Sequence, residues 1–172
     1  PITQEKNLQE TRKMKLTIMA GLLAAAVIAN PASASDWEHC YLDASKRYQI
    51  PARVLRAIAR VESGEKTGAI NEANRNGTTD YGVMQINSQH LQRLKRYNIS
   101  KSVLLNNPCA NIHVGAWILA ENMVTAKGKP WLAIGAYNAG FRESTSAEKA
   151  RNRYIGKVRQ ALASIKEDEN GI

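Results

Sequence analysis

The stretch VLRAIARVESG, residues 54–64, places one glutamate on the apolar face of a predicted helix. Apolar residues recur in it at the spacing of a single helical face (Val54, Leu55, Ile58, Val61). Glu62 falls four residues after Ile58, so it projects from this stripe. Gly64 is typical of the position that ends a helix, which puts Glu62 in the last turn. Loss of water and the helix dipole both raise the pKa of a carboxyl group there.

A glutamate that keeps its proton near neutral pH is a candidate general acid. The alternative is a border glutamate whose stem packs against the core while its carboxylate reaches solvent. This stretch alone leaves both interpretations open.

The amino-terminal part of the sequence has the pattern of an export signal. Residues 16–29, LTIMAGLLAAAVIA, form an apolar run that follows basic residues and precedes the small-residue pattern Ala32-Ser33-Ala34. We therefore expect a signal peptide over residues 14–34 and a periplasmic protein. The run is shorter than the roughly 20 residues that a membrane span needs, so no stable span is expected after cleavage. Residues 1–13 are interpreted as sequence upstream of the natural start.

The rest of the chain predicts a single compact domain over residues 35–166 with a flexible tail over 167–172. Residues 64–80 are rich in Gly, Asn and Thr and indicate a loop or small β-hairpin, and YGVMQIN (81–87) a short strand. The expected fold is mainly α, and α+β at most. The predicted helices cover residues 36–48, 51–63, 88–97, 100–106, 107–128, 130–138 and 146–166.

The 172 residues carry a net charge of +9, which favours a polyanionic partner such as a cell wall or membrane surface. Export and the lack of a recognisable nucleic-acid-binding motif disfavour nucleic acid. The last predicted helix is basic and either contacts anions or a protein partner, or is simply a solvated surface (Lys149, Arg151, Arg153, Lys157, Arg159). We expect a monomer.

The chain has two cysteines, Cys40 and Cys109. In an oxidising compartment they predict one disulfide, which would stabilise the fold by roughly 4 kcal/mol because it closes a loop of about 70 residues. Two free buried thiols are the alternative. Three scattered histidines without metal-site spacing argue against a metal, and no cofactor is expected.

Two further stretches combine glycine with polar and aromatic residues. GVMQIN (82–87) places Gln85 and Asn87 among apolar residues, and AIGAYNAG (133–140) places Tyr137 and Asn138 at the end of an apolar helix. Amides and a phenol suit a neutral ligand rich in hydroxyl and amide groups, such as a sugar chain. Core packing, a satisfied buried amide and an ordinary helix end are the alternatives.

The order VESG, GVMQIN, AYNAG resembles the motif set of the soluble lytic transglycosylases, which share a fold with goose-type lysozyme. The resemblance extends from about Trp37 to Val158. DYGVMQIN and NPCANIHVGAWIL are most similar to the small branch that accompanies secretion, conjugation and pilus systems. The implied substrate is the glycan strand of peptidoglycan, and the implied partners are proteins of such machinery.

The resemblance also implies roles for individual residues. Glu62 matches the catalytic acid, and Tyr137 and Asn138 match the pair beside it, with the tyrosine hydroxyl orienting the glutamate. Tyr154 resembles a further tyrosine near the cleft. The residues that match the cleft-lining motif are Gly82, Met84, Gln85, Ile86 and Asn87.

The implied reaction is cleavage of the β-1,4 bond between N-acetylmuramic acid and N-acetylglucosamine with formation of 1,6-anhydro ends. Asp80 keeps a hydrolytic muramidase open, because lysozymes commonly place an aspartate on the hairpin after the catalytic glutamate. Its alternative is a turn residue in TTDYG. A non-catalytic glycan-binding assembly subunit is the remaining class of function.

Overall fold

Helix α3 (Ala52–Ser63) carries Glu62 and buries Leu55 and Ile58 completely in the core. It follows α2 (Glu38–Tyr48) and ends, as predicted, at Gly64, whose φ of 66° is left-handed. The N–H of Gly64 bonds back to the carbonyl of Arg60 at 3.0 Å. Pro51 lies just before the first helical residue rather than in the first turn.

The structure is a computed structural model that describes residues 37–74 and 76–170. The predicted signal peptide and the upstream segment lie outside the described residues. All described residues belong to one folded unit. None of the described helices is long and apolar enough to cross a membrane.

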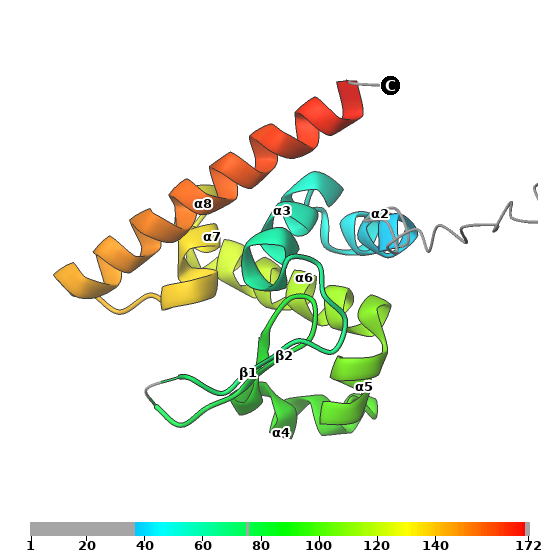
Figure 1. Ribbon diagram of the computed structural model, residues 1–172. Helices are drawn as coiled ribbons and strands as arrows, with labels where there is room; N and C mark the ends of the chain where they lie inside the picture. The colour runs from blue at the N-terminus through cyan, green and yellow to red at the C-terminus, as the bar shows by residue number, and fades with distance from the viewer. Residues whose placement is uncertain (1–36, 75, 171–172) are drawn as a thin grey trace, which may run out of the picture. The chain divides into compact units, whose positions relative to one another are not determined.

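Helix α6 (Pro108–Thr125) is the helix against which much of the core packs, since α2, α3, α5 (Lys101–Asn106) and α7 (Pro130–Ala139) all contact it. Helix α8 (Thr145–Asn170) lies across α3 and α7 (Figure 1). It runs past the predicted end at Lys166. The starts of α5 and α6 are capped as expected by the side chains of Ser100 and Asn107.

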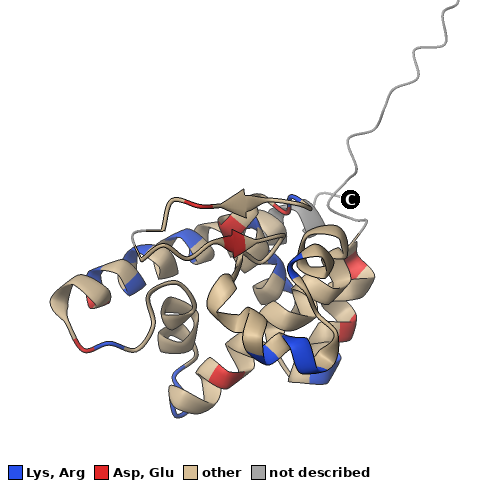
Figure 2. Cartoon of the chain, turned by 90° about the horizontal axis from the view of Figure 1, so that it is seen from below, with Lys and Arg blue, Asp and Glu red and all other residues tan. Residues whose placement is uncertain are grey.

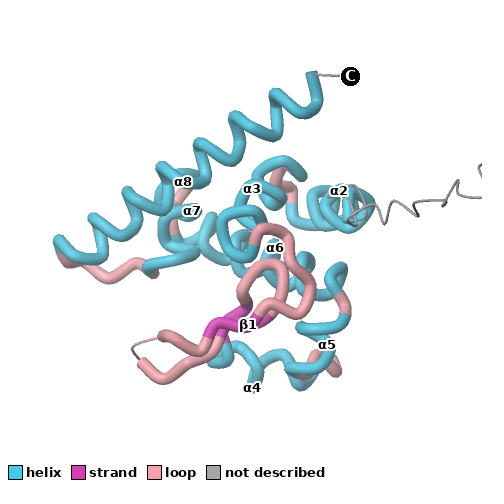
Figure 3. The backbone as a smooth tube through the Cα atoms, viewed as in Figure 1, coloured by secondary structure: helices cyan, strands magenta, loops and turns pink. Residues whose placement is uncertain are grey.

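A three-stranded antiparallel sheet follows α3, with strand order β1-β2-β3 (Figure 3). Its strands are β1 (Ile70–Asn71), β2 (Asp80–Tyr81) and β3 (Ile86–Asn87). Asp80 is paired with Asn71 on one side and with Asn87 on the other. The segment 81–87 therefore supplies two strand ends joined by a turn, instead of one short strand.

The segment after β3 is less regular than the predicted helix over 88–97. It consists of the 3₁₀ helix η2 (Ser88–His90), the short α4 (Leu91–Leu94) and the 3₁₀ helix η3 (Lys95–Tyr97). The side chain of Asn87 caps it by accepting from the N–H of Gln89, whereas the hydroxyl of Ser88 accepts from the N–H of Thr79.

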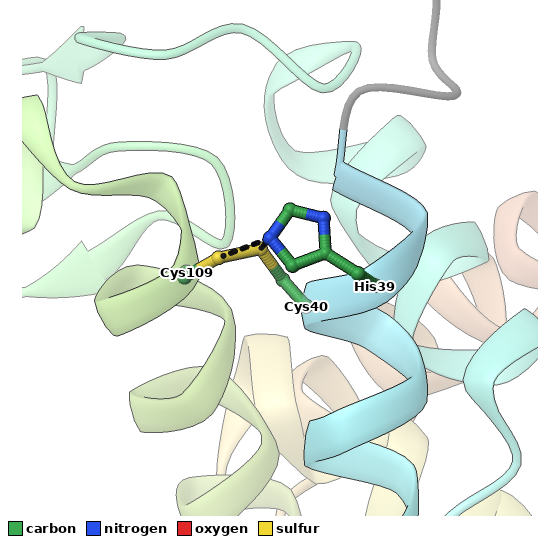
Figure 4. A group of neighbouring side chains, drawn as sticks. All are labelled: His39, Cys40 and Cys109. Atoms are coloured by element: carbon green, nitrogen blue, oxygen red, sulfur yellow. Dashed lines mark hydrogen bonds between the residues drawn. A yellow bond between two sulfur atoms is a disulfide. The ribbon is translucent and has the colours of Figure 1, made fainter.

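Cys40 of α2 and Cys109 of α6 form a disulfide with a Cα–Cα distance of 5.1 Å, which confirms the predicted pairing. His39 Nε2 lies 3.4 Å from each sulfur (Figure 4). Because both sulfurs are bonded to each other, this group offers no thiolate to a metal ion.

The turn between β2 and β3 is held against α6 by the fully buried Asn111. Its amide accepts from the N–H of Met84 at 2.7 Å and donates to the carbonyls of Tyr81 and Leu104 at 2.8 and 2.9 Å. Gly82 has a φ of 76°, and a Cβ there would collide with the Asn111 amide and the Leu104 carbonyl. The amide and the glycine thus fix the turn beside the cleft.

Candidate active site

The carboxyl group of Glu62 is largely removed from water between α3 and α8. Tyr154 of α8 donates a hydrogen bond from its hydroxyl to Glu62 Oε1 at 2.6 Å. Burial, assisted by the charge of Asp80, raises the pKa of Glu62 to about 7, although the Tyr154 hydrogen bond and Lys157 act in the opposite direction. Near neutral pH a substantial share of Glu62 therefore carries the proton that a general acid needs.

Glu62 opens into a cleft of about 520 Å³ lined by the sheet with its loop, α6 and α7. The lining is rich in side-chain amides. The asparagines and glutamines that line the cleft are Asn74, Asn76, Gln85, Asn87, Gln89, Asn122 and Asn138. Amides donate and accept hydrogen bonds and carry no charge. Such a surface suits hydroxyl and acetamido groups of a sugar chain better than a strongly charged ligand.

Asp80 lines the same cleft from β2 and is held by three asparagine amides. Asn87 Nδ2 donates to Asp80 Oδ1 at 2.7 Å, and Asn74 and Asn71 donate to Oδ2 at 2.8 and 3.2 Å. Hydrogen bonds from donors to both oxygens fix the orientation of this carboxyl group. The structure thus brings together the two carboxyl groups that the sequence placed 18 residues apart.

The contact with Glu62 that the resemblance assigned to Tyr137 is made by Tyr154 instead. The hydroxyl of Tyr137 donates to the carbonyl of Met84 at 2.9 Å, and the hydrogen bond to Glu62 comes from Tyr154. Tyr137 nevertheless lines the cleft, and burial, followed by the charges of Glu62 and Asp80, raises its pKa well above the usual value. It therefore positions the backbone of the β2–β3 turn and stays a neutral donor.

The GVMQIN motif divides into residues that face the cleft and residues that support it. Gln85, Ile86 and Asn87 line the cleft, together with Asn138 of α7. Gly82 and Met84 are not among the residues that line the cleft, so their contact with the glycan stays a prediction. Met84 is fully buried against Gly115 of α6, and its side chain is part of the core.

Asn111 and several cleft residues were not singled out from the sequence. A polar residue inside the apolar run CANIHVGAWIL was the available signal for Asn111, and the run of asparagines in NEANRNGTTD was the signal for Asn74 and Asn76. Asn122 of α6 gave no signal, because a polar residue near a helix end is ordinary.

A different opening, of about 820 Å³, lies between α2, α3, α6, α7 and α8. Its lining is mostly apolar, and Arg53 is its only charged lining residue. It contains no pair of acidic or basic groups suited to proton transfer. The chemistry therefore belongs to the smaller, amide-lined cleft.

Basic residues are spread along α8 and over other helices (Figure 2). Two of those in α8 have internal partners. Arg151 donates to the carbonyls of Gly140 and Arg142 at 3.0 and 3.1 Å, and Arg159 lies 4.5 Å over the ring of Trp131. These contacts give at least part of the basic helix a structural role.

Comparison with known proteins agrees with this geometry. Residues 39–159 match the model of the transglycosylase SLT domain family. The invasion protein IagB of Salmonella typhi is 45% identical over 131 residues, which cover 76% of this chain and 79% of that protein. The protein IpgF of Shigella flexneri is 44% identical over 114 residues, covering 66% and 71%, and the X polypeptide of Escherichia coli is 40% identical over 131 residues, covering 74% of each.

Among solved structures, an inactive mutant of the lytic transglycosylase Slt from Pseudomonas aeruginosa has a TM-score of 0.59 and 21% identity. The alignment covers 77% of this chain and 24% of that chain, so this chain corresponds to about a quarter of the larger protein. This likeness confirms the predicted lysozyme-like fold class. With the family match over most of the described residues, it follows that the chain belongs to the transglycosylase SLT domain family and is an enzyme that acts on peptidoglycan.

Proposed function

We propose that this transglycosylase cleaves the β-1,4 bond between N-acetylmuramic acid and N-acetylglucosamine and leaves 1,6-anhydromuramic ends. The observation that carries the proposal is Glu62: a carboxyl group with a pKa of about 7, held by the Tyr154 hydroxyl at 2.6 Å, at the wall of an amide-lined cleft. One group of this kind can serve first as acid and then as base near neutral pH.

In the first step, Glu62 donates its proton to the glycosidic oxygen as the bond from that oxygen to C1 breaks through an oxocarbenium-like state. The oxygen of the muramic 2-acetamido group stabilises C1. In the second step, the Glu62 carboxylate takes the proton of the C6 hydroxyl while that oxygen bonds to C1. The anhydro ring forms, and Glu62 returns to its protonated state.

Tyr154 suits this cycle because its hydroxyl donates to the carboxyl group in both steps. Its hydrogen bond lowers the pKa of Glu62, which means that it favours the carboxylate formed after proton transfer. Burial acts the other way and keeps the proton in place before substrate binds. The balance leaves the pKa within reach of both roles.

A hydrolytic muramidase is the second candidate, and the position of Asp80 supports it. Its oriented carboxyl group lines the same cleft as Glu62, and its charge raises the pKa of Glu62. It would stabilise positive charge at C1 or position a water. A separation of about 5 to 5.5 Å between the two carboxyl groups would suit a retaining reaction and about 6.5 to 9.5 Å an inverting one.

The cellular role that we propose is local opening of the wall, in the periplasm, for a secretion, conjugation or pilus apparatus. The small size of the matched relatives and the name of IagB as an invasion protein support such a role. Under this proposal a component of the apparatus sets where or when the enzyme cuts. Activity and position that are unchanged without any such component would contradict it.

Mass spectrometry of the products from isolated peptidoglycan tests the chemistry. The chain and its Glu62→Gln and Asp80→Asn variants are compared. Anhydro ends, one water lighter than hydrolysed ends and absent with Glu62→Gln, are the expected result. Reducing muramic ends would replace the proposal with the muramidase. Wall binding without any product from the folded chain would favour the non-catalytic subunit.

A further inference from the structure

A second groove is lined by residues of α2, α4, η3 and α6, and we name it the aromatic groove. It encloses about 560 Å³ between the end of α2, the first half of α6 and the α4–η3 segment. Its ring-bearing lining residues are Tyr48, Tyr97, His113 and Trp117. Tyr97 is 55% exposed and lies edge-on to Trp117 with 5.9 Å between ring centroids. Exposed aromatic side chains of this kind are frequent in binding surfaces.

Arginine side chains flank three of these rings. The guanidinium of Arg93 lies 4.1 Å over the ring of Trp117, that of Arg96 5.2 Å over Tyr97, and that of Arg47 5.8 Å over Tyr48. Arg93 is neutralised by Glu121 at 2.7 Å. Among the side chains that the structure describes, no ion pair joins Arg47 or Arg96 to a carboxylate.

The charge at the aromatic groove is therefore positive. Burial and then the charge of Arg47 lower the pKa of His113. The charge of Asp43 of α2 raises this pKa, but its effect is smaller than that of Arg47. No acidic residue lines the aromatic groove. Its electrostatic complement is a ligand with free carboxylates and apolar groups that can lie on aromatic rings.

The aromatic groove lies within a short distance of the catalytic cleft along two chain segments. Trp117 lines the groove and the next residue of α6, Ile118, lines the cleft. Likewise His90 lines the cleft, and Leu94, four residues later, lines the groove. Four residues span about one helical turn, which is roughly 5 to 6 Å. An extended peptide of four residues reaches about 13 to 14 Å, which is longer than the separation of these lining residues along the chain.

We propose that the aromatic groove binds the acidic peptide that branches from the muramic lactyl group of the strand in the cleft. This rests on the proposed function, because the glycan must lie in the cleft for its peptide to reach the groove. The peptide supplies both parts of the complement: carboxylates for Arg47 and Arg96, and aliphatic side chains for the rings. The groove then selects strands that still carry peptides over stripped strands.

Binding to soluble glycan strands tests this proposal in the Glu62→Gln background, which keeps the strands intact. One sample carries tetrapeptides, and the other is the same material after an amidase has removed them. The variants are Tyr97→Ala and the double variant Arg47→Glu/Arg96→Glu. The control is Arg53→Glu, which reverses an exposed arginine at the other, larger opening. Calorimetry gives the dissociation constants, and circular dichroism checks folding.

We expect the double variant to weaken binding of peptide-bearing strands about tenfold and of stripped strands less than twofold. Tyr97→Ala should follow the same pattern with a smaller loss, and Arg53→Glu should change neither. The difference should shrink at 0.5 M salt because exposed charges are screened. Equal losses for both strands, or no loss for either, would overturn the proposal.

Cleavage of stripped strands separates this proposal from the proposed function. With Glu62 in place, the groove variants should still produce anhydro ends from stripped strands at an unchanged rate. If no variant and no parent chain produced such ends, the proposed function would fail, while the binding comparison would still decide the groove.

Discussion

Glu62 and Asp80 carry the same functional group into one cleft, Glu62 from a helix and Asp80 from the sheet, and their surroundings differ in kind. Glu62 lies between two helices, where burial raises its pKa to about 7 and a single tyrosine contacts it. Asp80 lies on the middle strand of the sheet, where three asparagine amides donate to it. The helical wall removes its carboxyl group from water, and the sheet wall surrounds its carboxyl group with hydrogen-bond donors.

Under the proposed function, this difference divides acid and electrostatic roles between the two carboxyl groups. A helix end can withdraw a side chain from water while its backbone stays hydrogen-bonded. A side chain on a short strand beside an asparagine-rich loop is instead surrounded by the hydrogen-bond donors of neighbouring residues. Each of the following predictions removes one side of the comparison and leaves the other in place.

The largest effect is expected from Glu62→Gln, because the amide keeps the shape and cannot transfer the proton. The rate of strand cleavage should fall by roughly 10³-fold or more. The measurement is the initial rate of release of soluble fragments from peptidoglycan. Wall binding serves as the control, and it should stay within a few fold. A variant that cuts at the parent rate would remove Glu62 from the mechanism.

Asp80→Asn is expected to have the next largest effect on the rate. The substitution removes the charge and replaces one acceptor oxygen by an NH2 group, which then faces asparagine donors. The rate should therefore fall about 10- to 100-fold. The ratio of anhydro to reducing ends should stay unchanged if Asp80 acts through its charge alone. A shift of this ratio would show that Asp80 decides whether water or the C6 hydroxyl attacks.

The free energy of unfolding of Glu62→Gln, compared with that of the parent at several pH values, tests the burial of Glu62. Since the folded-state pKa of Glu62 is above its unfolded value of 4.5, the parent chain loses stability as pH rises from about 4.5 to 7. The variant escapes this loss, so its free energy of unfolding should exceed that of the parent by about 1 to 2 kcal/mol above pH 7, and the gap should narrow toward pH 4.5. Urea unfolding at several pH values measures it, and a constant difference would contradict the assigned burial.

Tyr154→Phe should have the smallest effect on the rate, about a few fold, because the acid keeps its proton without the hydroxyl. Its signature is in the pH profile. The activity of the parent should fall as pH rises through about 7, and the variant should shift this fall to higher pH, because the lost hydrogen bond had lowered the pKa of Glu62. Tyr137→Phe is the matched control, since its hydroxyl contacts Met84 rather than Glu62.

The sequence predicted the helical wall of the site better than the sheet wall. The apolar period of residues 54–61 and the glycine at 64 were enough to place Glu62 on a buried face and at a helix end. Such local periodicity depends on few long-range contacts. The disulfide followed from a count of two cysteines and from the export that the sequence predicts.

The sheet wall depends on contacts that periodicity does not encode. The partners of Asp80 come from two segments of the chain, β1 with the loop after it and β3, and meet only when the two hairpins form. The two tyrosines could not be assigned from their motifs, because the choice between Met84 and Glu62 as acceptor depends on how α7 and α8 pack. The reason why residue 82 must be a glycine also could not be predicted, because it depends on the position of the Asn111 amide.

The disulfide has a consequence for the order in which the enzyme becomes active. It closes the chain from Cys40 to Cys109, a loop that contains both carboxyl groups, whereas Tyr154 comes from α8 beyond it. Under the proposed export, in which the amino end crosses the membrane first, this loop can close before α8 arrives. A half-exported chain would hold its acid without the helix that covers it. Its site would be complete only once the last helix packs against α3.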